Sequence, residues 1–385
     1  EQSQACLNSA EHEKNQGRKV LNVPNLRFPE FQGEWEKCTL EDVINFSTTR
    51  VNSSELNKDN YVSTENMLQD YQGIVKAKSV PEDVNVVSFS CGDVLISNIR
   101  PYLKKVWKAT FNGGCSSDVF VLKANDNIES DYLHYVIAND KFINFVMSGT
   151  KGVKMPRGDK KQMETYSLSL PQIQEQHKIA RLLSLLDERI ATQNKIIDKL
   201  QSLIKGIRND VFGKLRKNIG FNAVVGDVLD YEQPQSYIVE NTEYTNEGTP
   251  VLTANKAFVL GYTLETDGIY DKGDCIIFDD FTLDCKYVDF PFKVKSSAIK
   301  ILTAKNKELL RYTFEFLKYL DLSTEEHKRH YIAETQNQEF ILPTEQIVKT
   351  IAYIFSTLSL RMETAVKRRD VFDKQKQYLL RQMFI

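Results

Sequence analysis

Two segments of the chain, 172 positions apart, share the same start and the same spacing. Residues 170–212 align on residues 342–384 without a gap, both open with Leu-Pro, and both then reach Ile-Ala. Twelve of the 43 aligned pairs are identical. That is more than two unrelated amphipathic helices would share by chance. The sequence therefore contains an internal duplication, and the duplicated segment limits how the chain can fold.

The apolar residues of both segments recur alternately at steps of four and three, which is the a/d pattern of packed helices. This seam covers residues 179–211 in the first segment and 351–383 in the second. We expect Pro171 and Pro343 in the first helical turn, where a missing N–H needs no partner. About 40 helical residues form a rod of roughly 60 Å. Because one seam cannot bury itself, we predict that the two helices pair antiparallel.

Polar residues interrupt the seam at Gln193, Arg369 and Lys376. Such residues either fix the register between paired helices or point outward because the apolar stripe drifts around the helix. For Lys376 we expect outward drift. For Gln193 and Arg369 both interpretations stay open.

The regions between the two helices repeat more faintly. Three pairs of segments alternate apolar and polar residues or are rich in β-branched residues, and they are predicted as strands: 38–43 with 223–228, 91–97 with 272–278, and 116–124 with 296–304. A fourth pair, 131–137 with 308–314, has helical spacing. The fold class is therefore α/β with two globular domains and two long, coiled-coil-like helices. The predicted order is a flexible tail 1–22, a first domain 23–169, a first helix 170–219, a second domain 220–341 and a second helix 342–385.

Bulk composition fits this plan. The 385 residues suffice for two separate cores, and 41% hydrophobic with 26% charged residues is typical of a soluble protein. No apolar run approaches the roughly 18 residues that a membrane span needs, and no signal-peptide pattern opens the chain. The six cysteines form no Cys-x-x-Cys pair. We therefore expect a cytoplasmic protein with reduced thiols, a structural metal being the alternative.

The net charge of −2 is unevenly distributed along the chain. Residues 172–220 carry ten Lys and Arg against five Asp and Glu, and residues 343–385 carry eight against four. Residues 221–335 carry 12 against 20. The repeated segments are therefore basic, and the second domain is acidic.

No catalytic motif emerges from the sequence. The segment 149–155 has two glycines, but not at the spacing of a phosphate-binding loop. There is no Gly-rich loop for S-adenosylmethionine and no Asn/Asp-Pro-Pro-aromatic run of the kind that holds a flipped base. Asp279 and Asp280 are a possible metal pair, but no Lys follows at the spacing of nucleases. We predict a chain without a catalytic site and without a bound metal or cofactor.

Two basic stretches of the first domain are candidates for DNA contact. Residues 100–108 interleave cations with Tyr102 and Trp107, and residues 150–161 combine cations with glycines that allow close backbone approach to a phosphate. The alternative is a solvated strand and a solvated loop. The candidate contact residues are Arg100, Tyr102, Lys104, Lys105, Lys151, Lys154, Arg157 and Lys160, with Lys108 and Lys161 beside them.

The second domain offers fewer cations. The candidate contact residues here are Asn255, Lys256, Lys286 and Lys295. Further cations of the same region are Lys293, Lys328 and Arg329. Asn255 has the side chain that reads an adenine edge through two hydrogen bonds, although an Asn at such a place more often caps a turn. The acidic excess either faces a protein partner or is solvated.

Several stretches carry a resemblance to a known family. They are the opening Asn-Val-Pro-x-Leu-Arg-Phe-Pro-x-Phe at residues 22–31 with Trp35, the Leu-Pro helix starts, and the segments 249–263 and 276–302. With the duplicated order of domain and helix, they resemble the specificity subunit of type I restriction–modification enzymes. The likeness covers nearly everything after residue 22.

The resemblance implies a subunit that binds double-stranded DNA and reads a split target, one half per domain, in a complex with methyltransferase subunits, two per chain, and restriction subunits. It also implies that S-adenosylmethionine, ATP and Mg²⁺ belong to those partners. The alternative is a protein–protein scaffold without DNA readout. A self-contained nuclease or methyltransferase is disfavoured by the missing motifs.

Overall fold

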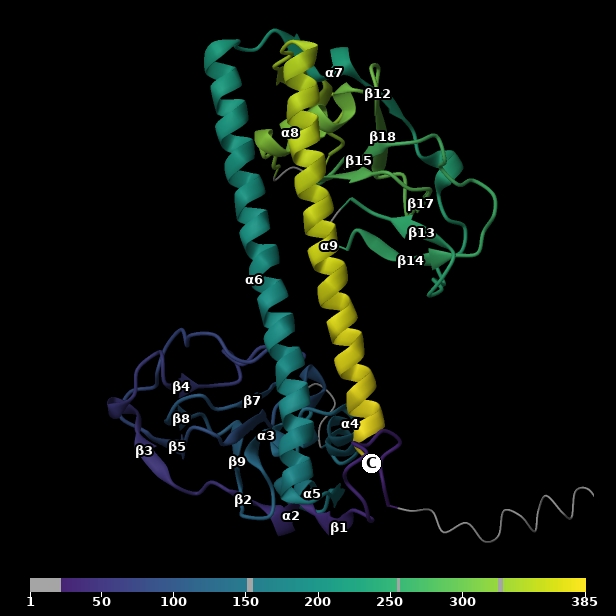
Figure 1. Ribbon diagram of the computed structural model, residues 1–385. Helices are drawn as coiled ribbons and strands as arrows, with labels where there is room; N and C mark the ends of the chain where they lie inside the picture. The colour runs from purple at the N-terminus through teal and green to yellow at the C-terminus, as the bar shows by residue number, and fades with distance from the viewer. Residues whose placement is uncertain (1–21, 151–154, 255–256, 325–327) are drawn as a thin grey trace, which may run out of the picture. The chain divides into compact units, whose positions relative to one another are not determined.

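The computed structural model describes residues 22–150, 155–254, 257–324 and 328–385. These residues form two compact units. Unit 1 comprises the chain up to Ala191 together with the segment from Asp370 to Ile385, and unit 2 runs from Thr192 to Arg369. Two long helices, α6 (Ile173–Asn218) and α9 (Glu345–Met383), each contribute one part to each unit (Figure 1).

The other elements of unit 1, in chain order, are β1 (Glu36–Thr39), α2 (Leu40–Val43), β2 (Ile44–Phe46), β3 (Arg50–Asn52), η1 (Ser53–Glu55), β4 (Tyr61–Val62), β5 (Asn85–Phe89), β6 (Val94–Ser97), η2 (Pro101–Leu103), β7 (Val106–Lys108), β8 (Gly113–Cys115), β9 (Val119–Ala124), α3 (Ser130–Ile137), α4 (Asp140–Ser148), α5 (Lys160–Glu164) and β10 (Ser167–Leu170).

The other elements of unit 2 are β11 (Ala223–Val224), α7 (Val225–Val228), β12 (Leu229–Glu232), η3 (Gln235–Tyr237), β13 (Thr249–Leu252), β14 (Val259–Thr263), β15 (Cys275–Asp279), β16 (Cys285–Val288), β17 (Lys293–Val294), β18 (Ile299–Ala304), α8 (Leu309–Leu320), η4 (Thr335–Asn337) and β19 (Glu339–Phe340).

Both units contain a four-stranded antiparallel sheet with the same internal order. Its strands run β2-β9-β6-β7 in unit 1 and β12-β18-β15-β16 in unit 2. The central strands are those predicted from the paired segments at 91–97 and 272–278 and at 116–124 and 296–304. The predicted helical pair appears as α3 and α8. The faint repeat of the sequence thus corresponds to a repeated fold, and this part of the prediction is confirmed.

The central strands are hydrophobic on both faces because each sheet separates two cores. In β6 the side chains of Val94 and Ile96 join the core with α3, whereas Leu95 joins the opposite core. In β15 Ile276 and Ile277 divide between two cores in the same way. Successive side chains of a strand point to opposite faces, so a strand buried on both sides reads as a continuous apolar run.

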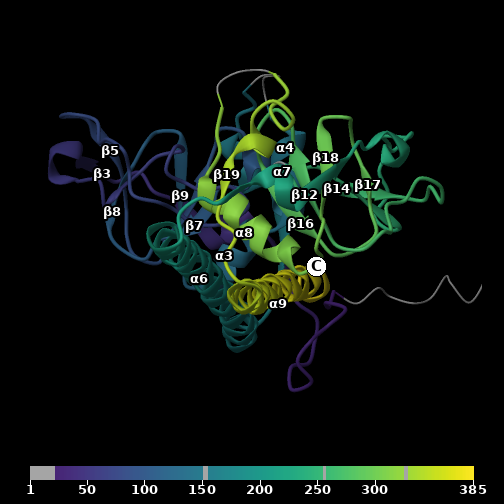
Figure 2. The same cartoon turned by 90° about the horizontal axis from the view of Figure 1, so that it is seen from above.

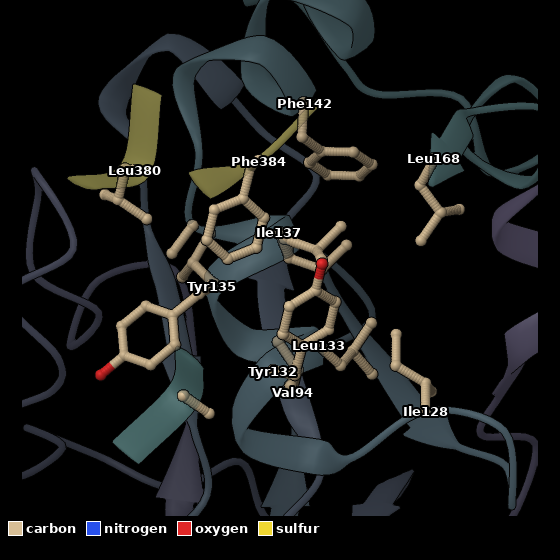
Figure 3. Close-up of a cluster of buried hydrophobic side chains, with 14 of the residues drawn as sticks. Val94, Ile128, Tyr132, Leu133, Tyr135, Ile137, Phe142, Leu168, Leu380 and Phe384 are labelled. Atoms are coloured by element: carbon tan, nitrogen blue, oxygen red, sulfur yellow. The ribbon is translucent and has the colours of Figure 1, made fainter. Parts of the chain in front are cut away.

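In unit 1 the beginning of α6 and the end of α9 share one core with the globular part. Ile179 and Leu183 of α6 lie in the same buried cluster as Leu379 and Met383 of α9. Phe384, just after α9, stacks on Tyr132 of α3 with ring centroids 5.2 Å apart. Figure 3 shows the ring of Phe384 among the apolar side chains of this core.

Lys376 corrects one expectation. We expected this residue of the seam to point outward, but its side chain is only 14% exposed and its amine lies 2.6 Å from the carboxylate of Asp187 on α6. The hydroxyl of Tyr135 donates to the same carboxylate at 2.8 Å, and the amine of Lys376 lies over the Tyr135 ring. The seam does not drift here, because the lysine has an acidic partner across it. This contact joins the first part of α6 to the last part of α9 within unit 1.

In unit 2 the end of α6 and the beginning of α9 pack on α8. Ile351 and Phe355 of α9 share a core with Phe212 of α6, and Figure 2 shows α8 beside α9. The Glu315 side chain of α8 is 1% exposed and accepts hydrogen bonds from Arg208 of α6 and Arg311 of α8 at 2.7 and 2.8 Å. The pair of Arg208 and Glu315 links α8 to α6, and separating it would leave the buried carboxylate with one of its two guanidinium partners.

The seam prediction is confirmed within each unit. No residue of the two predicted seams is exposed, including Gln193 and Arg369. The helices begin slightly later than expected: Pro171 and Pro343 each lie two residues before the first helical residue, rather than in the first turn. At its other end, α6 is closed by Gly220, whose φ of +75° favours glycine and whose N–H bonds to Leu215.

Two further expectations are corrected at the domain edges. The segments 38–43 and 223–228 were predicted as strands, but only their first residues are extended, and the rest form the helical turns α2 and α7. The turns form because an aspartate three residues on accepts a hydrogen bond from the backbone N–H before the turn: Asp42 from Thr39, and Asp227 from Val224. Asn22, placed in the tail by the sequence, is bonded to the carbonyl of Trp35 and to Ser169. It belongs to unit 1.

Candidate nucleic-acid interface

The backbone that carries Arg100 is held in an uncommon conformation. Arg100 and Lys104 flank η2 with φ of 50° and 54°, and Asp70 and Tyr71 have φ of 53° and 61°. The N–H groups of Asp70 and Tyr71 donate to the carbonyls of Leu103 and Lys104 at 3.1 and 3.0 Å. Left-handed conformations of residues other than glycine cost energy and persist only where their surroundings fix them. The two turns therefore brace each other.

The fold brings the two basic stretches of the first domain together. The N–H of Arg100 donates to the carbonyl of Pro156 at 2.8 Å, and Ile99 forms an isolated antiparallel bridge with Arg157. The side chains of Arg100, Tyr102 and Arg157 are all exposed. We call these three residues the basic edge of unit 1. The guanidinium of Arg100 makes no hydrogen bond or ion pair with any described residue.

Three lysines of the first stretch are occupied within unit 1. The amine of Lys104 pairs with Asp140 at 2.8 Å and lies over the Tyr71 ring. The amine of Lys105 donates to the carbonyl of Thr64 at 2.5 Å. Burial, and then the nearby charge of Arg100, lower the pKa of Lys105. Lys108 pairs with Asp131. These contacts weaken the prediction that Lys104 and Lys105 contact DNA, because the amine of Lys104 is paired with an acid and the amine of Lys105 is bound to a backbone carbonyl.

Trp107 is not part of an exposed aromatic set. Its side chain is 9% exposed and packs edge-on against Phe89, with ring centroids 5.9 Å apart. Of the two aromatic residues of this stretch, Tyr102 is the exposed one. The expected interleaving of cations and accessible aromatic rings is therefore wrong for Trp107, because strand alternation turns it into the core behind the sheet.

The second basic stretch is described only in part. Lys151 and Lys154 lie outside the described residues. Lys160 is exposed, begins the short helix α5, and places its amine 4.5 Å from the centroid of the Phe46 ring. Lys161 is also exposed.

The candidate residues of the second domain divide into accessible and occupied cations. Asn255 and Lys256 lie outside the described residues. Lys295 is exposed and Lys286 is half-buried, and neither forms an ion pair with another described residue. Lys293 is 3% exposed and pairs with Glu265 at 2.6 Å. The amine of Lys293 is therefore occupied within unit 2, which weakens the case for a DNA contact.

The remaining cations of this region sit beside acids. Lys328 pairs with Glu334 at 2.9 Å. Arg329 is exposed but lies over the Phe281 ring and 3.5 Å from Asp280. Of these two, Arg329 has the weaker internal pairing, because 3.5 Å is a long distance for an ion pair.

Asp279 and Asp280 perform a structural task. The Asp279 carboxylate accepts from the N–H groups of Phe281 and Thr282, and Asp280, 1% exposed, accepts from those of His330 and Tyr331. The amine of Lys300 lies 3.3 Å from Asp280. Within the described ranges, no group of three or more His, Cys, Asp or Glu side chains is arranged to hold a metal ion. Five cysteines in these ranges are free thiols.

Asp118 is a residue of this region that the sequence did not single out. Asp118 immediately precedes β9, and its carboxylate lies 3.0 Å from the guanidinium of Arg157. The two residues are 39 positions apart, and no local pattern predicts their contact. A polar cavity of about 370 Å³ is lined by Asp118 together with Ser116, Asn66 and residues 63–65.

Comparison with known proteins places the chain. The family model for the type I restriction modification DNA specificity domain matches residues 32–202. Over 126 residues the chain is 45% identical to the specificity subunit of the type I restriction enzyme EcoR124I/EcoR124II from Escherichia coli. Over this part of its length the chain is similar to the specificity subunits of type I restriction enzymes.

The matches to curated specificity subunits are partial. The Escherichia coli alignment covers 31% of this chain and 31% of that relative. The putative MjaX specificity subunit of Methanocaldococcus jannaschii is 28% identical over 213 residues, or 51% of this chain and 49% of that protein. The chain thus aligns with half or less of the length of these specificity subunits.

A likeness in fold to a solved structure extends over nearly the whole chain. The crystal structure of a type I restriction–modification S subunit from M. genitalium matches with a TM-score of 0.66, covering 94% of this chain and 99% of that one at 15% identity. At this identity the match shows the fold: two mixed α/β parts with two long helices. Among the described residues of this chain, no helix is both long and apolar enough to cross a membrane.

Proposed function

We propose that this chain is the DNA sequence-specificity subunit of a type I restriction–modification complex and that it reads a bipartite target. Unit 1 and unit 2 each bind one half of the target, and the helices hold the two recognition domains apart. The observation that carries the proposal is a repetition. Each unit contains the same four-stranded sheet together with one part of α6 and one part of α9. A duplicated recognition module suits a target that has two halves.

The basic edge supports DNA contact by unit 1. Arg100, Tyr102 and Arg157 are exposed on turns that the sheet and the braced backbone hold in place. Positioned cations on a rigid scaffold are suited to phosphates and base edges, and Tyr102 adds an aromatic contact. Lys160 extends the candidate surface, and Lys151 and Lys154, outside the described residues, are further candidates from the same stretch of sequence.

In unit 2 the candidate contacts are Lys295, Lys286 and Arg329, with Asn255 and Lys256 in the segment outside the described residues. Lys295 follows directly on β17, and its N–H is bonded to the carbonyl of Leu252. Its amine therefore projects from a fixed backbone. The acidic excess of residues 221–335 restricts DNA contact to a small part of the surface of unit 2.

The helices offer apolar surface for protein partners. In unit 2, Tyr353 and Leu360 of α9 are 74% and 64% exposed and lie seven residues apart on one helix face. In unit 1, Val371 and Tyr378 are 61% and 53% exposed with the same spacing. Exposed apolar residues on one stripe of a helix are typical of a helix-docking surface. We assign these two patches to the methyltransferase subunits, one for each unit; the restriction subunits join the same complex.

This assignment makes the chain a non-catalytic subunit that acts in the cytoplasm, where its DNA is. S-adenosylmethionine is the methyl donor that the methyltransferase subunits hold, and ATP and Mg²⁺ serve the restriction subunits. The chain itself contributes recognition and spacing.

The test is selection of DNA from a random-sequence duplex library by the chain assembled with its methyltransferase subunits. We expect two short defined blocks separated by a spacer of fixed length and free sequence. Substitution of Tyr102 should change binding to one block, and substitution of Lys295 should change binding to the other. An assembled complex that binds all duplexes equally would refute the proposal.

The second candidate function is a protein–protein scaffold without DNA readout. The acidic balance of residues 221–335, 12 cations against 20 acids, favours it. The same selection distinguishes the two functions, because a scaffold would recover no defined sequence even when fully assembled.

A further inference from the structure

Arg157 is the cation of the basic edge whose position is most completely fixed. Its backbone forms the bridge with Ile99, and the residues on either side are also tied to the end of β6. The carbonyl of Pro156 accepts from Arg100 at 2.8 Å, and the N–H of Gly158 donates to the carbonyl of Asn98 at 2.7 Å. The Cα of Arg157 therefore cannot move independently of the sheet.

The side chain of Arg157 is also held. Its Nη1 lies 3.0 Å from the carboxylate of Asp118, and the two side chains are 54% and 34% exposed. Asp118 is fixed in turn, because its carbonyl accepts from the N–H of Asn98 at 2.9 Å and the next residue begins β9. Both partners of this ion pair are thus anchored beside neighbouring strands, β6 and β9, which are hydrogen-bonded to each other.

An exposed ion pair of this kind adds little to folding stability, typically about 0–1 kcal/mol. Its larger physical effect is on orientation. A guanidinium has five N–H donors in a planar fork, and one carboxylate contact at Nη1 leaves donors on the opposite side of the fork. The ion pair therefore holds the remaining N–H donors of the guanidinium in a fixed direction. Binding then costs less side-chain conformational entropy than it would for an unpaired arginine.

A fixed fork beside a carboxylate is poorly suited to phosphate. A phosphate contact needs charge but little orientation, and the negative charge of Asp118 would repel a phosphate brought to the same guanidinium. The Hoogsteen edge of guanine is a different partner: it is uncharged and offers O6 and N7 as two acceptors, which match two parallel N–H groups. Arg100, which has no described partner, has the properties of a phosphate contact instead.

We propose that Arg157 reads a guanine in the half of the target bound by unit 1, and that Asp118 is the positioning residue that aims its guanidinium. This inference rests on the proposed function and adds to it the base and the pair of residues that determine it. Asp118 does not touch the base, but acts through Arg157.

The experiment uses the full chain assembled with its methyltransferase subunits and a random-sequence duplex library, followed by affinity measurements on the selected target. Arg157→Lys keeps the charge and removes the fork, so it should lose about 5- to 150-fold in discrimination at one G·C pair while its salt dependence stays that of the wild type. Replacing that guanine by 7-deazaguanine, which lacks the N7 acceptor, should weaken the wild type and leave Arg157→Lys unaffected.

Asp118→Asn tests the positioning role. It should reduce discrimination at the same G·C pair, and its affinity for non-target DNA should be equal to or above that of the wild type, because a negative charge is lost. Merely structural damage would lower binding to every sequence. The matched control is the exposed pair of Arg181 and Glu188 on α6, 3.3 Å apart and 65% and 63% exposed. Arg181→Lys and Glu188→Gln should leave base discrimination unchanged.

The outcomes separate the inference from the function on which it rests. If the wild-type complex selects a bipartite target and Arg157→Lys keeps full discrimination, the inference is wrong and the proposed function stands. Equal loss of affinity for all sequences would make Arg157 a phosphate contact, which also overturns the inference. Unchanged discrimination in Asp118→Asn would remove the positioning role. A wild-type complex that selects no sequence overturns both.

Discussion

Phe212 and Phe384 occupy the same position of the two helical repeats, and each enters the aromatic core of a different unit. Phe212 is fully buried, with its ring centroid 5.3 Å from that of Tyr312 and 5.5 Å from that of Phe316 in unit 2. Phe384 stacks on Tyr132 in unit 1 (Figure 3). The duplication therefore repeats a way of attaching a globular part to the helices, in addition to the seam.

This relationship predicts unit-specific destabilisation. Phe212→Ala should lower the free energy of unfolding of unit 2 by about 3–5 kcal/mol, the usual loss for a buried phenylalanine, and Phe384→Ala should destabilise unit 1. Both tryptophans of the chain, Trp35 and Trp107, belong to unit 1. The unfolding midpoint measured by tryptophan fluorescence should therefore shift in Phe384→Ala. The destabilisation of unit 2 in Phe212→Ala should appear in unfolding followed by circular dichroism. Equal shifts of the fluorescence midpoint by both variants would show that the units unfold as one.

The second prediction concerns spacing. Because α9 returns to unit 1, an insertion in α6 alone would break the pairing of the helices within that unit. We therefore insert seven residues after Ala191 and seven after Arg369, where each helix passes from one unit to the other. Seven residues keep the phase of the seam and add roughly 10 Å, so the spacer of the DNA target should lengthen by up to about three base pairs.

Insertions of five residues at the same two places serve as the control for phase. They rotate the following seam by roughly 140° and should disrupt assembly rather than lengthen the spacer. A target spacer that keeps its original length with the seven-residue insertions would contradict the role of the helices as a ruler.

Arg100 and Lys104 differ in their expected effect on DNA affinity, although both are cations of one turn. Arg100→Ala removes a guanidinium without a described partner, so the slope of log affinity against log salt should flatten by about 0.9. Lys104→Ala removes an amine already paired with Asp140, and the slope should stay at the wild-type value. Measurement over a range of salt concentrations decides this. Identical slopes for both variants would mean that internal pairing does not select the contact residues.

Lys151 and Lys154 provide a separate prediction for the glycine-containing stretch. Changing both residues to Ala should flatten the same slope by up to about 1.8 and weaken binding to all sequences alike, if each lysine meets a phosphate. The selected target sequence should stay the same. A change in the preferred bases would show instead that one of them reads a base edge.

His134 predicts how the stability of unit 1 depends on pH. Burial, followed by the charge of Lys376 on α9, lowers its pKa from 6.5 to about 4; Lys108 acts in the same direction and Asp187 opposes it. The Nδ1 atom is buried without a hydrogen-bond partner. The imidazole is therefore neutral in the folded protein, whereas the unfolded chain binds the proton below pH 6.5. Stability is lost as pH falls from about 6.5 towards 4, because the unfolded state takes up more protons.

The variant His134→Gln should remove this part of the pH dependence. Between pH 7 and pH 4 the wild type should lose on the order of 2–4 kcal/mol more of its unfolding free energy than the variant. Denaturant unfolding followed by tryptophan fluorescence at several pH values measures it. A constant difference across that range would mean that His134 is already protonated, or accessible to solvent, in the folded protein.

The sequence by itself determined the duplication, the helix seams and the central strands. These follow from periodicity, which is a local property: a step of 3.5 residues marks a paired helix, and a continuous apolar run marks a strand buried on both faces. Lys376 shows the limit. Its place in the seam was visible, but its partner Asp187 lies 189 positions away, so the expected outward orientation was wrong.

Only the tertiary structure decided which cations are accessible. Lys104, Lys105 and Lys293 resemble Arg100 and Lys295 in sequence. In the fold, however, Lys104 and Lys293 pair with Asp140 and Glu265, and the amine of Lys105 is bound to the carbonyl of Thr64. The pairing of Asp118 with Arg157 likewise required the fold, which places the start of β9 beside the strand end that carries the Arg157 bridge. The charge of a side chain is set by its type, but its compensation depends on neighbours that only the packing of distant segments brings into contact.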